Sequence, residues 1–328
     1  MRQPLTQRAR SSEHGFVIIA VLWILVALSA LVAIFSVYLS NSARALGVMD
    51  IGVQSEALVS ASLELTAYQL LMADKKERPA QGSFRFRMDG GEAFVTFTSE
   101  AARVDLNKAP KELLANLFEV LGAEQKAAEQ VAVRIDGWRT KPKTGATNDE
   151  EALYLAAGLT YSPRQAPFAH VNELSLVLGV PPAMVERALP YLTVFSGSSD
   201  IDVLLAAPEV IAALPGMTPD VLDNFLKQRA SLPRDQKAVA AALGPAAKAA
   251  ANLPDAKAFR VRTTTRFDNG RRTSIEAVIL LSNTQGKKDG AEGADIVKAG
   301  AQDKEPYKIL SWQDEAETVT RPSRQAGR

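Results

Sequence analysis

Cysteine is absent from this chain of 328 residues, and histidine occurs only twice, as His14 and His170. These absences exclude a disulfide, a thiol nucleophile, a zinc site built on thiolates and a metal site that needs several imidazoles. The sequence also lacks a Gly-x-Ser-x-Gly elbow, a Walker loop and a His-Glu-x-x-His helix. His170 has no acidic partner placed by a motif, so we interpret it as a neighbour of the helix that begins at Val171. The sequence therefore predicts a protein that is not an enzyme.

Charge is nearly balanced over the whole chain, with 38 Lys and Arg residues against 37 Asp and Glu residues, but it is missing from one long stretch. No charged residue lies between Phe16 and Ala43. About 20 apolar residues are enough for a helix to cross the hydrocarbon core of a membrane. The stretch also lacks the polar stripe that a core helix shows. Residues 16–39 are therefore predicted to be a transmembrane helix.

Basic residues before this helix predict its orientation. Residues 1–15 carry Arg2, Arg8 and Arg10 against Glu13 alone. Short segments rich in Lys and Arg stay on the cytoplasmic side of a membrane. We therefore expect a cytoplasmic N-terminus, with Arg44 and everything after it on the outer side.

Three processing routes compete for this N-terminal segment. A secretory signal peptide would have an apolar stretch of about 7–15 residues and then a small-x-small cleavage site. The stretch here is longer, although Ala43-Arg44-Ala45 has the form of such a site. A plain signal anchor fits the length. The third route depends on Gly15-Phe16, where a polar basic leader meets the apolar run.

The remaining sequence predicts one small sheet with a long helical insertion. The N-terminal helix continues over residues 44–72 and ends where Pro79 and Gly82 break it. Two pairs of alternating strands flank Asp-Gly-Gly and Asp-Asn-Gly turns, which are strong hairpin signals. Neither hairpin is wide enough to be stable alone, so we expect a single antiparallel sheet on the N-terminal helix. The predicted strands are residues 83–88, 92–98, 258–267, 271–281 and 307–312.

The insertion, residues 105–250, is rich in Ala and Leu, and it repeats itself. Residues 104–114 align without a gap onto residues 201–211. In the first copy we expect Asn107 to be the N-cap of a helix whose first turn contains Pro110. We interpret Ser196–Ser199 as a linker between the repeats. The identical positions of the two copies are Asp105 and Asp202, Ala109 and Ala206, and Glu112 and Glu209.

Short helices in the insertion are joined by turns at Leu121-Gly122, Leu178-Gly179 and Pro215-Gly216. These turns resemble those of helix-hairpin-helix modules, whose nucleic-acid-binding version holds a phosphate on a Gly-apolar-Gly turn. The second glycine is missing in all three turns. The motif is therefore expected to keep its fold but not to bind phosphate. A membrane-anchored nucleic-acid-binding protein stays the alternative function.

In this order, the features resemble the general secretion pathway protein K family, the K-type minor pseudopilins of type II secretion systems. The Gly15-Phe16 junction is similar to the prepilin peptidase site of pilins and pseudopilins. The resemblance implies an α+β fold, with a pilin-like long N-terminal helix packed on a small antiparallel sheet and a large all-α, SAM/helix-hairpin-helix-like domain inserted between the strands. The stretches that carry it are residues 104–114, 161–168, 171–174, 189–194, 208–216 and 307–312.

This resemblance implies a non-enzymatic minor pseudopilin of the type II protein secretion system. Such a subunit forms or caps the pseudopilus tip with the I-type and J-type minor pseudopilins. It helps to initiate fibre assembly for the export of folded proteins across the outer membrane. The other implied partners are the major pseudopilin, the prepilin peptidase and the inner-membrane assembly platform. The implied location is the inner membrane, crossed once, with the globular part in the periplasm.

The resemblance also assigns roles to three N-terminal residues. The peptidase would cut after Gly15 and N-methylate Phe16. The fifth residue of the mature chain would then be Ala20, where most pilin-like proteins have glutamate. An unpaired carboxylate is costly in lipid, so its absence removes both a cost and a docking charge. Loss of this glutamate is characteristic of the K-type subunit, which needs no subunit ahead of it.

Calcium is the one metal that the resemblance raises, because an acidic loop after the first repeat can hold it in this family. Here Lys141 and Lys143 fall where acidic residues are expected. A solvated acidic helix start explains most of the remaining carboxylates equally well. We therefore expect no cofactor, with calcium as a weak alternative. Its candidate ligands are Asp136, Asp149, Glu150 and Glu151.

The predicted organisation has six parts. They are a prepilin leader (1–15), the transmembrane part of the helix (16–39), the rest of the helix with the first hairpin (40–104), the inserted helical domain with repeats at about 105–195 and 201–250 (105–250), the closing strands (255–313) and a disordered tail (314–328).

Overall fold

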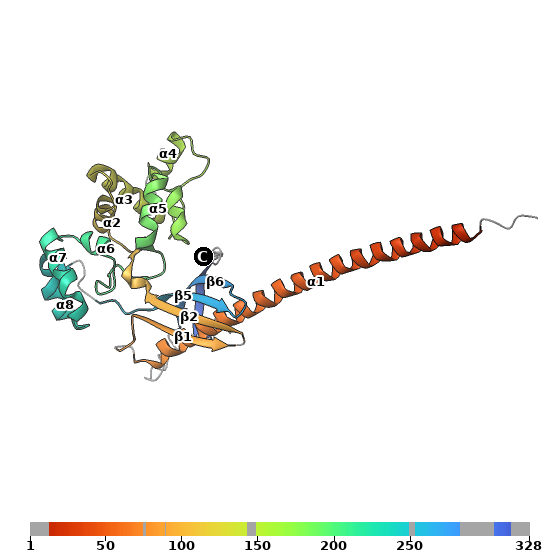
Figure 1. The fold of residues 1–328 in the computed structure, drawn as a ribbon. Helices are drawn as coiled ribbons and strands as arrows, with labels where there is room; N and C mark the ends of the chain where they lie inside the picture. The colour runs from red at the N-terminus through yellow and green to blue at the C-terminus, as the bar shows by residue number, and fades with distance from the viewer. Residues whose placement is uncertain are drawn as a thin grey trace, which may run out of the picture. The chain divides into compact units, whose positions relative to one another are not determined.

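The computed structural model of this chain describes residues 13–74, 77–88, 90–142, 149–248, 253–282 and 305–315. Two units, residues 1–57 and 58–328, are described separately (Figure 1). Helix α1 (Glu13–Met72) contributes to both units. Most of the predicted leader and all but two residues of the predicted tail lie outside the described residues.

The described part of the first unit is helical throughout. Within α1, residues Ile18–Ser42 form a 25-residue segment with a mean hydropathy of 3.0, and none of it is buried. This length and composition are sufficient to cross a membrane. The predicted transmembrane segment, residues 16–39, therefore lies on a helix as expected.

In the second unit, the end of α1 has one buried face. Leu58, Leu63 and Leu70 are each at most 1% exposed. Two polar side chains on the same face are satisfied within the helix, because the hydroxyls of Ser62 and Thr66 each donate to the carbonyl four residues earlier, at 2.7 Å. The helix ends at Met72, before the predicted breakers.

One five-stranded antiparallel sheet packs on this part of α1, with the strand order β1-β2-β5-β6-β7. Both predicted hairpins and their joining into a single sheet are confirmed. Gly91 permits close packing of helix and sheet, because a Cβ there would lie 2.7 Å from Leu58 Cδ1. The strands are β1 (Gln81–Met88), β2 (Gly91–Ser99), β5 (Ala258–Phe267), β6 (Arg272–Leu281) and β7 (Tyr307–Glu315).

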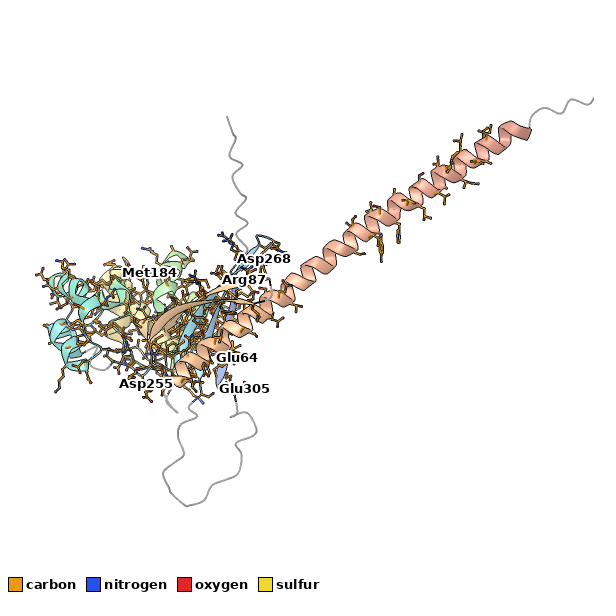
Figure 2. The ribbon with its side chains drawn as sticks, turned by 60° about the horizontal axis from the view of Figure 1, so that its bottom comes forward. Glu64, Arg87, Met184, Asp255, Asp268 and Glu305 are labelled. Carbon is orange, nitrogen blue, oxygen red and sulfur yellow. The ribbon has the colours of Figure 1, made fainter. Side chains whose placement is uncertain are left out.

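The two hairpin turns are tied together at one end of the sheet. Arg87 Nη2 lies 2.7 Å from Asp268 Oδ1, and Figure 2 shows the two side chains beside each other. The backbone N–H of Asp268 also donates to the carbonyl of Gly90 at 3.0 Å. The β1–β2 and β5–β6 hairpins, which are distant in sequence, therefore meet at their turns as well as along β2 and β5.

The residues between β2 and β5 are mainly helical, as predicted for the insertion. A correction is needed to the all-α description, because β3 (Val104–Asp105) pairs in parallel with β4 (Leu192–Thr193). The α-helices are α2 (Lys111–Val120), α3 (Gln125–Arg139), α4 (Asp149–Ala156), α5 (Pro182–Ala188), α6 (Pro208–Ala212), α7 (Pro219–Gln228) and α8 (Gln236–Leu243). The 3-10 helices are η1 (Glu100–Ala102), η2 (Val171–Leu176), η3 (Leu189–Tyr191), η4 (Arg229–Ser231) and η5 (Gly244–Lys248).

Aromatic side chains fill the centre of the first helical repeat. The ring of Trp138 lies 6.1 Å from that of Tyr154 and 6.0 Å from that of Phe168. The buried hydroxyl of Tyr154 accepts a hydrogen bond from the Leu178 N–H at 2.9 Å. This polar tip is therefore satisfied, and α3, α4 and the loop that holds Phe168 share one core.

The predicted N-cap of the first repeat is wrong. The N-cap of α2 is Pro110, which makes no side-chain cap hydrogen bond. The Asn107 amide instead reaches Phe168, with Nδ2 donating to its carbonyl at 3.0 Å and Oδ1 accepting from its N–H at 2.7 Å. A contact across 61 residues has displaced the local preference of asparagine for a helix terminus.

The two predicted repeats make equivalent contacts. Arg139, at the end of α3, donates to the carbonyl of Ala109 at 2.9 Å, and Arg229, just after α7, donates to the carbonyl of Ala206 at 2.7 Å. Ala109 and Ala206 are identical positions in the sequence alignment. The Ser196–Ser199 segment between the repeats is also anchored, since Gly197 N–H donates to Asp105 Oδ2 at 2.8 Å.

Candidate functional site

The apolar segment Ile18–Ser42 carries more than half of the large exposed apolar side chains in the described part of the chain. Its bulky side chains are accessible all round the helix, and Trp23 is 71% exposed. Soluble monomers rarely leave a contiguous apolar surface of this extent open to water. The segment therefore needs lipid or neighbouring protein around it.

The predicted processing residues lie in the first turns of α1. Gly15 and Phe16 come directly before the apolar segment, and Ala20 lies inside it. The Phe16 side chain falls outside the described ones. Cleavage after Gly15 and the role of position 20 therefore stay predictions.

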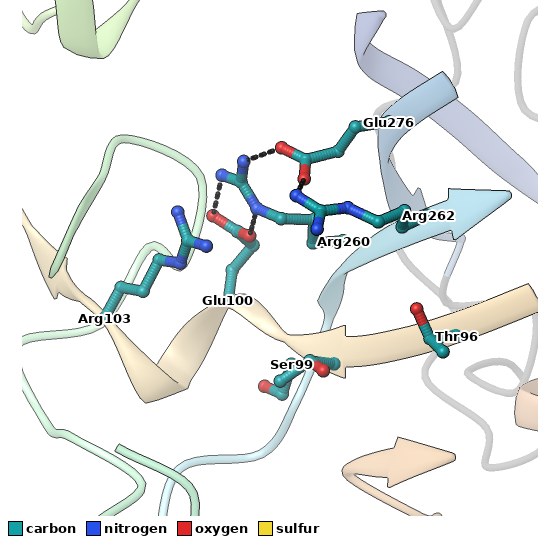
Figure 3. A pocket seen from close by; sticks show the side chains of 8 residues that line it. Thr96, Ser99, Glu100, Arg103, Arg260, Arg262 and Glu276 are labelled. Atoms are coloured by element: carbon teal, nitrogen blue, oxygen red, sulfur yellow. Dashed lines mark hydrogen bonds and ion pairs between the residues drawn. The ribbon is translucent and has the colours of Figure 1, made fainter. Parts of the chain in front are cut away.

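A second candidate site is a hollow of about 240 Å³ on the sheet face, where the sheet meets the helical segment. It is called the charged pocket below (Figure 3). The pocket lies at the end of β2 and beside β5 and β6, and five of its eight lining side chains are ionisable. The lining residues are Thr96, Thr98, Ser99, Glu100, Arg103, Arg260, Arg262 and Glu276.

Arg260 is the centre of an ion-pair network in this pocket. Its Nε lies 2.7 Å from Glu100 Oε1, and its Nη2 lies 3.2 Å from Glu100 Oε2. Its Nη1 also donates to Glu276 Oε1, and Arg262 Nη2 lies 2.9 Å from Glu276 Oε2. Glu100 is only 1% exposed, so these partners replace the hydrogen bonds to water that burial removes.

The network also joins the sheet to the helical segment. The hydroxyl of Thr193, a β4 residue, donates to Glu100 Oε2. Glu100 lies in η1, the short helix that follows β2, whereas Arg260 and Glu276 come from β5 and β6. The buried carboxylate of Glu100 therefore connects η1 with β5 and with the parallel β3–β4 pair, and Arg260 extends the network to β6.

Acidification is expected to destabilise this network through Glu276. Burial alone raises the pKa of Glu276, but the charges and hydrogen bonds of Arg260 and Arg262 outweigh it and hold the pKa below 4.5. A depressed folded pKa stabilises the folded chain above the unfolded pKa, and this stabilisation is lost as the pH falls through the folded value. Between about pH 7 and about pH 3, the free energy of unfolding should fall more steeply in the native chain than in Glu276→Gln. Parallel curves would contradict this assignment.

Sequence reasoning missed the charged pocket. The available signals were Arg260 and Arg262 at alternating positions of one strand, and Glu276 within the otherwise apolar run of residues 275–281. Strand alternation places the two arginines on the same sheet face. Their meeting with Glu276 and Glu100 depends on strand register and on the path of the chain after β2, which the local sequence does not specify.

The calcium candidates in the helical segment have protein partners. Asp136 Oδ2 lies 2.9 Å from Lys111 Nζ, and Asp136 Oδ1 lies 3.0 Å from Arg139 Nη2. Burial acts to raise the pKa of Asp136, but these two cations outweigh it and lower the pKa. Two adjacent cations make Asp136 a poor ligand for a divalent ion in this arrangement.

Glu150 and Glu151, two of the other calcium candidates, also have protein partners. Glu150 Oε2 lies 2.8 Å from Arg134 Nη1, and Glu151 Oε1 accepts from the Ser162 hydroxyl at 3.3 Å. The side chain of Asp149 lies outside the described ones. Across the described ranges, no group of three or more His, Asp or Glu side chains is placed to hold a metal. The absence of a cofactor stays a prediction, with calcium as its alternative.

The two remaining motif interpretations concern His170 and the glycine turns. His170 is the N-cap of η2, and its Nδ1 accepts from the Asn172 N–H at 3.1 Å, which confirms its interpretation as a helix-terminus neighbour.

In the three glycine turns, the N–H after each glycine already donates to a backbone carbonyl, so it is not free to hold a phosphate. These donors are Ala123, Val180 and Met217, at 2.9, 3.3 and 3.0 Å from their acceptors.

Known proteins match both the sequence and the fold. Residues 95–197 match the family described as "Type II secretion system (T2SS), protein K". A relative, type II secretion system protein K of Klebsiella pneumoniae, is 26% identical over 180 residues. That match covers 48% of this chain and 55% of the relative, so it spans about half the length of each protein.

A solved structure extends the similarity to most of the fold. It is a chain of the GspK-GspI-GspJ complex from the type 2 secretion system of enterotoxigenic Escherichia coli, with a TM-score of 0.52 and 15% identity. The match covers 80% of this chain and 94% of that one, and at this identity it shows a shared fold. The chain is therefore similar to type II secretion system protein K in the sequence of residues 95–197 and in fold over most of its length.

Proposed function

We propose that this protein is a minor pseudopilin of a type II secretion system and that its role is structural. Helix α1 is the observation that carries the proposal. The same helix supplies an uncharged, exposed segment at Ile18–Ser42 and a face buried against an antiparallel sheet at residues 58–72. The first feature suits a membrane or neighbouring apolar helices, and the second holds a globular unit on that helix.

The proposed location is the inner membrane, crossed once by Ile18–Ser42. Arg2, Arg8 and Arg10 precede the segment and favour a cytoplasmic N-terminus. The sheet and the helical segment would then lie in the periplasm. Prepilin peptidase would cut after Gly15 and methylate Phe16, which begins the apolar run.

The proposed position is the tip of the pseudopilus, in a complex with I-type and J-type minor pseudopilins and above the major pseudopilin. A tip subunit needs an apolar helix that packs beside the subunits below it. It also needs a head too bulky to be followed by another subunit. The helical domain at about 105–250, with its two related repeats and SAM/helix-hairpin-helix-like form, would supply that bulk. The assembly platform of the inner membrane would receive the complex.

Complex formation tests this proposal. The tagged full-length chain, expressed with its peptidase and with the I-type, J-type and major pseudopilins, should retain the two minor subunits after solubilisation in mild detergent. A chain with the same tag and the apolar helix of an unrelated single-pass protein in place of residues 16–42 is the matched control. Recovery of neither minor subunit by the native chain would contradict the proposed role.

A substitution at position 20 tests the tip position. Ala20→Glu is expected to lower both the membrane level of the protein and the yield of the complex, because a tip subunit offers that carboxylate no partner in lipid. Ala20→Gln has nearly the same shape without the charge and should resemble the native chain more closely. Equal complex yields for Ala20→Glu and the native chain would mean that the carboxylate finds a partner, as it would inside the fibre. Immunoblots of membranes and of the purified complex give both quantities.

A further inference from the structure

The charged pocket has one positive charge more than its own carboxylates neutralise. Its ionisable side chains are three arginines and two glutamates. All four carboxylate oxygens already accept hydrogen bonds from Arg260, Arg262 or Thr193. The glutamates are therefore satisfied by two of the arginines, and the third arginine is left over.

The remaining arginine is Arg103. Its backbone N–H donates to the carbonyl of Glu100 at 3.1 Å, but its guanidinium donates no hydrogen bond within the part of the chain that the structure describes. Figure 3 shows this guanidinium directed toward the network, without a bond to it. Burial and the adjacent charge of Arg260 lower the pKa of Arg103. A half-buried cation without a hydrogen-bonded partner is costly, and an incoming anion would relieve that cost.

Hydroxyl groups line the same hollow. Thr96 and Thr98 point to one face of β2, and Ser99 ends the strand. Ser99 Oγ accepts from the Ala101 N–H at 3.2 Å, which leaves its own hydrogen to donate. A planar guanidinium matches the two oxygens of a carboxylate, and the hydroxyls of the same hollow are further possible donors.

We propose that the charged pocket binds one carboxylate group, with Arg103 as its principal partner. The single excess charge selects the ligand class, because a monocarboxylate neutralises it and a dianion such as sulfate leaves a net negative charge. The pocket opens on an exposed sheet face, where Phe94 is 51% exposed and Arg266 is also exposed. The carboxylate is either the side chain of an acidic residue on another protein chain or a free small acid. This inference does not depend on the proposed function.

Nuclear magnetic resonance of the arginine side chains tests the site. The full-length chain, labelled with 15N-arginine in detergent micelles, is titrated at constant ionic strength with acetate, with glutamate capped at both ends, and with sulfate. The Arg103 Nε–Hε signal is identified by its absence in Arg103→Lys. We expect this signal to shift saturably with a carboxylate and more weakly with sulfate. Tighter binding of capped glutamate than of acetate would identify the natural ligand as an acidic side chain of another protein chain. Tighter binding of acetate would identify it as a free small acid.

Two variants show whether the effect is specific. Arg103→Gln should weaken carboxylate binding about tenfold or more, read from the Arg260 and Arg262 signals, because it removes a charged donor. Arg266→Gln, a matched change on the same sheet face outside the pocket, should leave binding unchanged. Three results would overturn the proposal. They are no saturation of the native Arg103 signal by about 100 mM carboxylate, tighter binding of sulfate, and equal weakening by the two variants.

Discussion

Replacing Arg260 with methionine is expected to lower the free energy of unfolding by about 3–5 kcal/mol, the usual result of removing one partner of a buried ion pair. Arg260 contacts both Glu100 and Glu276, and Glu100 is 1% exposed. Without the guanidinium, the Glu100 carboxylate keeps Thr193 as its hydrogen-bond donor but loses the cation that bonds to both of its oxygens. Urea unfolding of the full-length chain in detergent, followed by tryptophan fluorescence, measures the loss.

Arg266→Met is the matched control, because Arg266 is exposed on the same strand and should change stability by no more than about 0.5 kcal/mol. A second control removes both charges. Arg260→Met combined with Glu100→Met should recover much of the loss, since the Glu100 carboxylate is then no longer buried without its cation and Glu276 keeps Arg262. Equal effects of Arg260→Met and Arg266→Met would contradict the network as a structural element.

Phe118→Ala is expected to lower the free energy of unfolding by about 3–5 kcal/mol, as large-to-small substitutions of buried aromatic residues do. Phe118 lies in the last turns of α2, is 0% exposed and belongs to the core of the helical segment. That core is shared by both predicted repeats, so a cavity at Phe118 affects the whole helical segment. Thermal unfolding followed by far-ultraviolet circular dichroism reports the change.

Phe94→Ala is the control for Phe118→Ala, because it removes the same atoms from an exposed position of β2. Phe94→Ala should change the free energy of unfolding by about 0.5 kcal/mol, because only cross-strand contacts of an exposed ring are lost. A loss from Phe94→Ala as large as that from Phe118→Ala would mean that the sheet face is covered in the folded protein and that the core is assigned wrongly.

Much of the fold could be predicted because its signals are local. The Asp-Gly-Gly and Asp-Asn-Gly sequences specify tight turns, and Gly90 and Gly270 adopt the positive φ values, 77° and 83°, that such turns require. The uncharged stretch from Phe16 to Ala43 needs no tertiary information to predict a long apolar helix. The joining of the two distant hairpins into one sheet could be predicted because a two-stranded hairpin is not stable alone.

Features set by tertiary contacts were not predictable in the same way. Asn107 has a strong local preference for capping a helix, but its amide bonds to Phe168 instead. The charged pocket depends on register, because Arg262 lies opposite Glu276 in the β5–β6 pairing. The short β3–β4 pair joins residues far apart in sequence, and two-residue strands leave almost no pattern. Each of these contacts depends on where the chain returns after many residues.

The identity of the N-terminal residue tests the central claim most directly. The protein is purified from membranes of cells with and without the prepilin peptidase, and its intact mass and first residue are determined. The proposed function predicts a chain that begins at N-methylated Phe16 only when the peptidase is present. A chain that keeps Met1 in both strains would be an ordinary signal anchor, and one that begins near Ala45 would be a released domain. Either result would contradict a place in the pseudopilus.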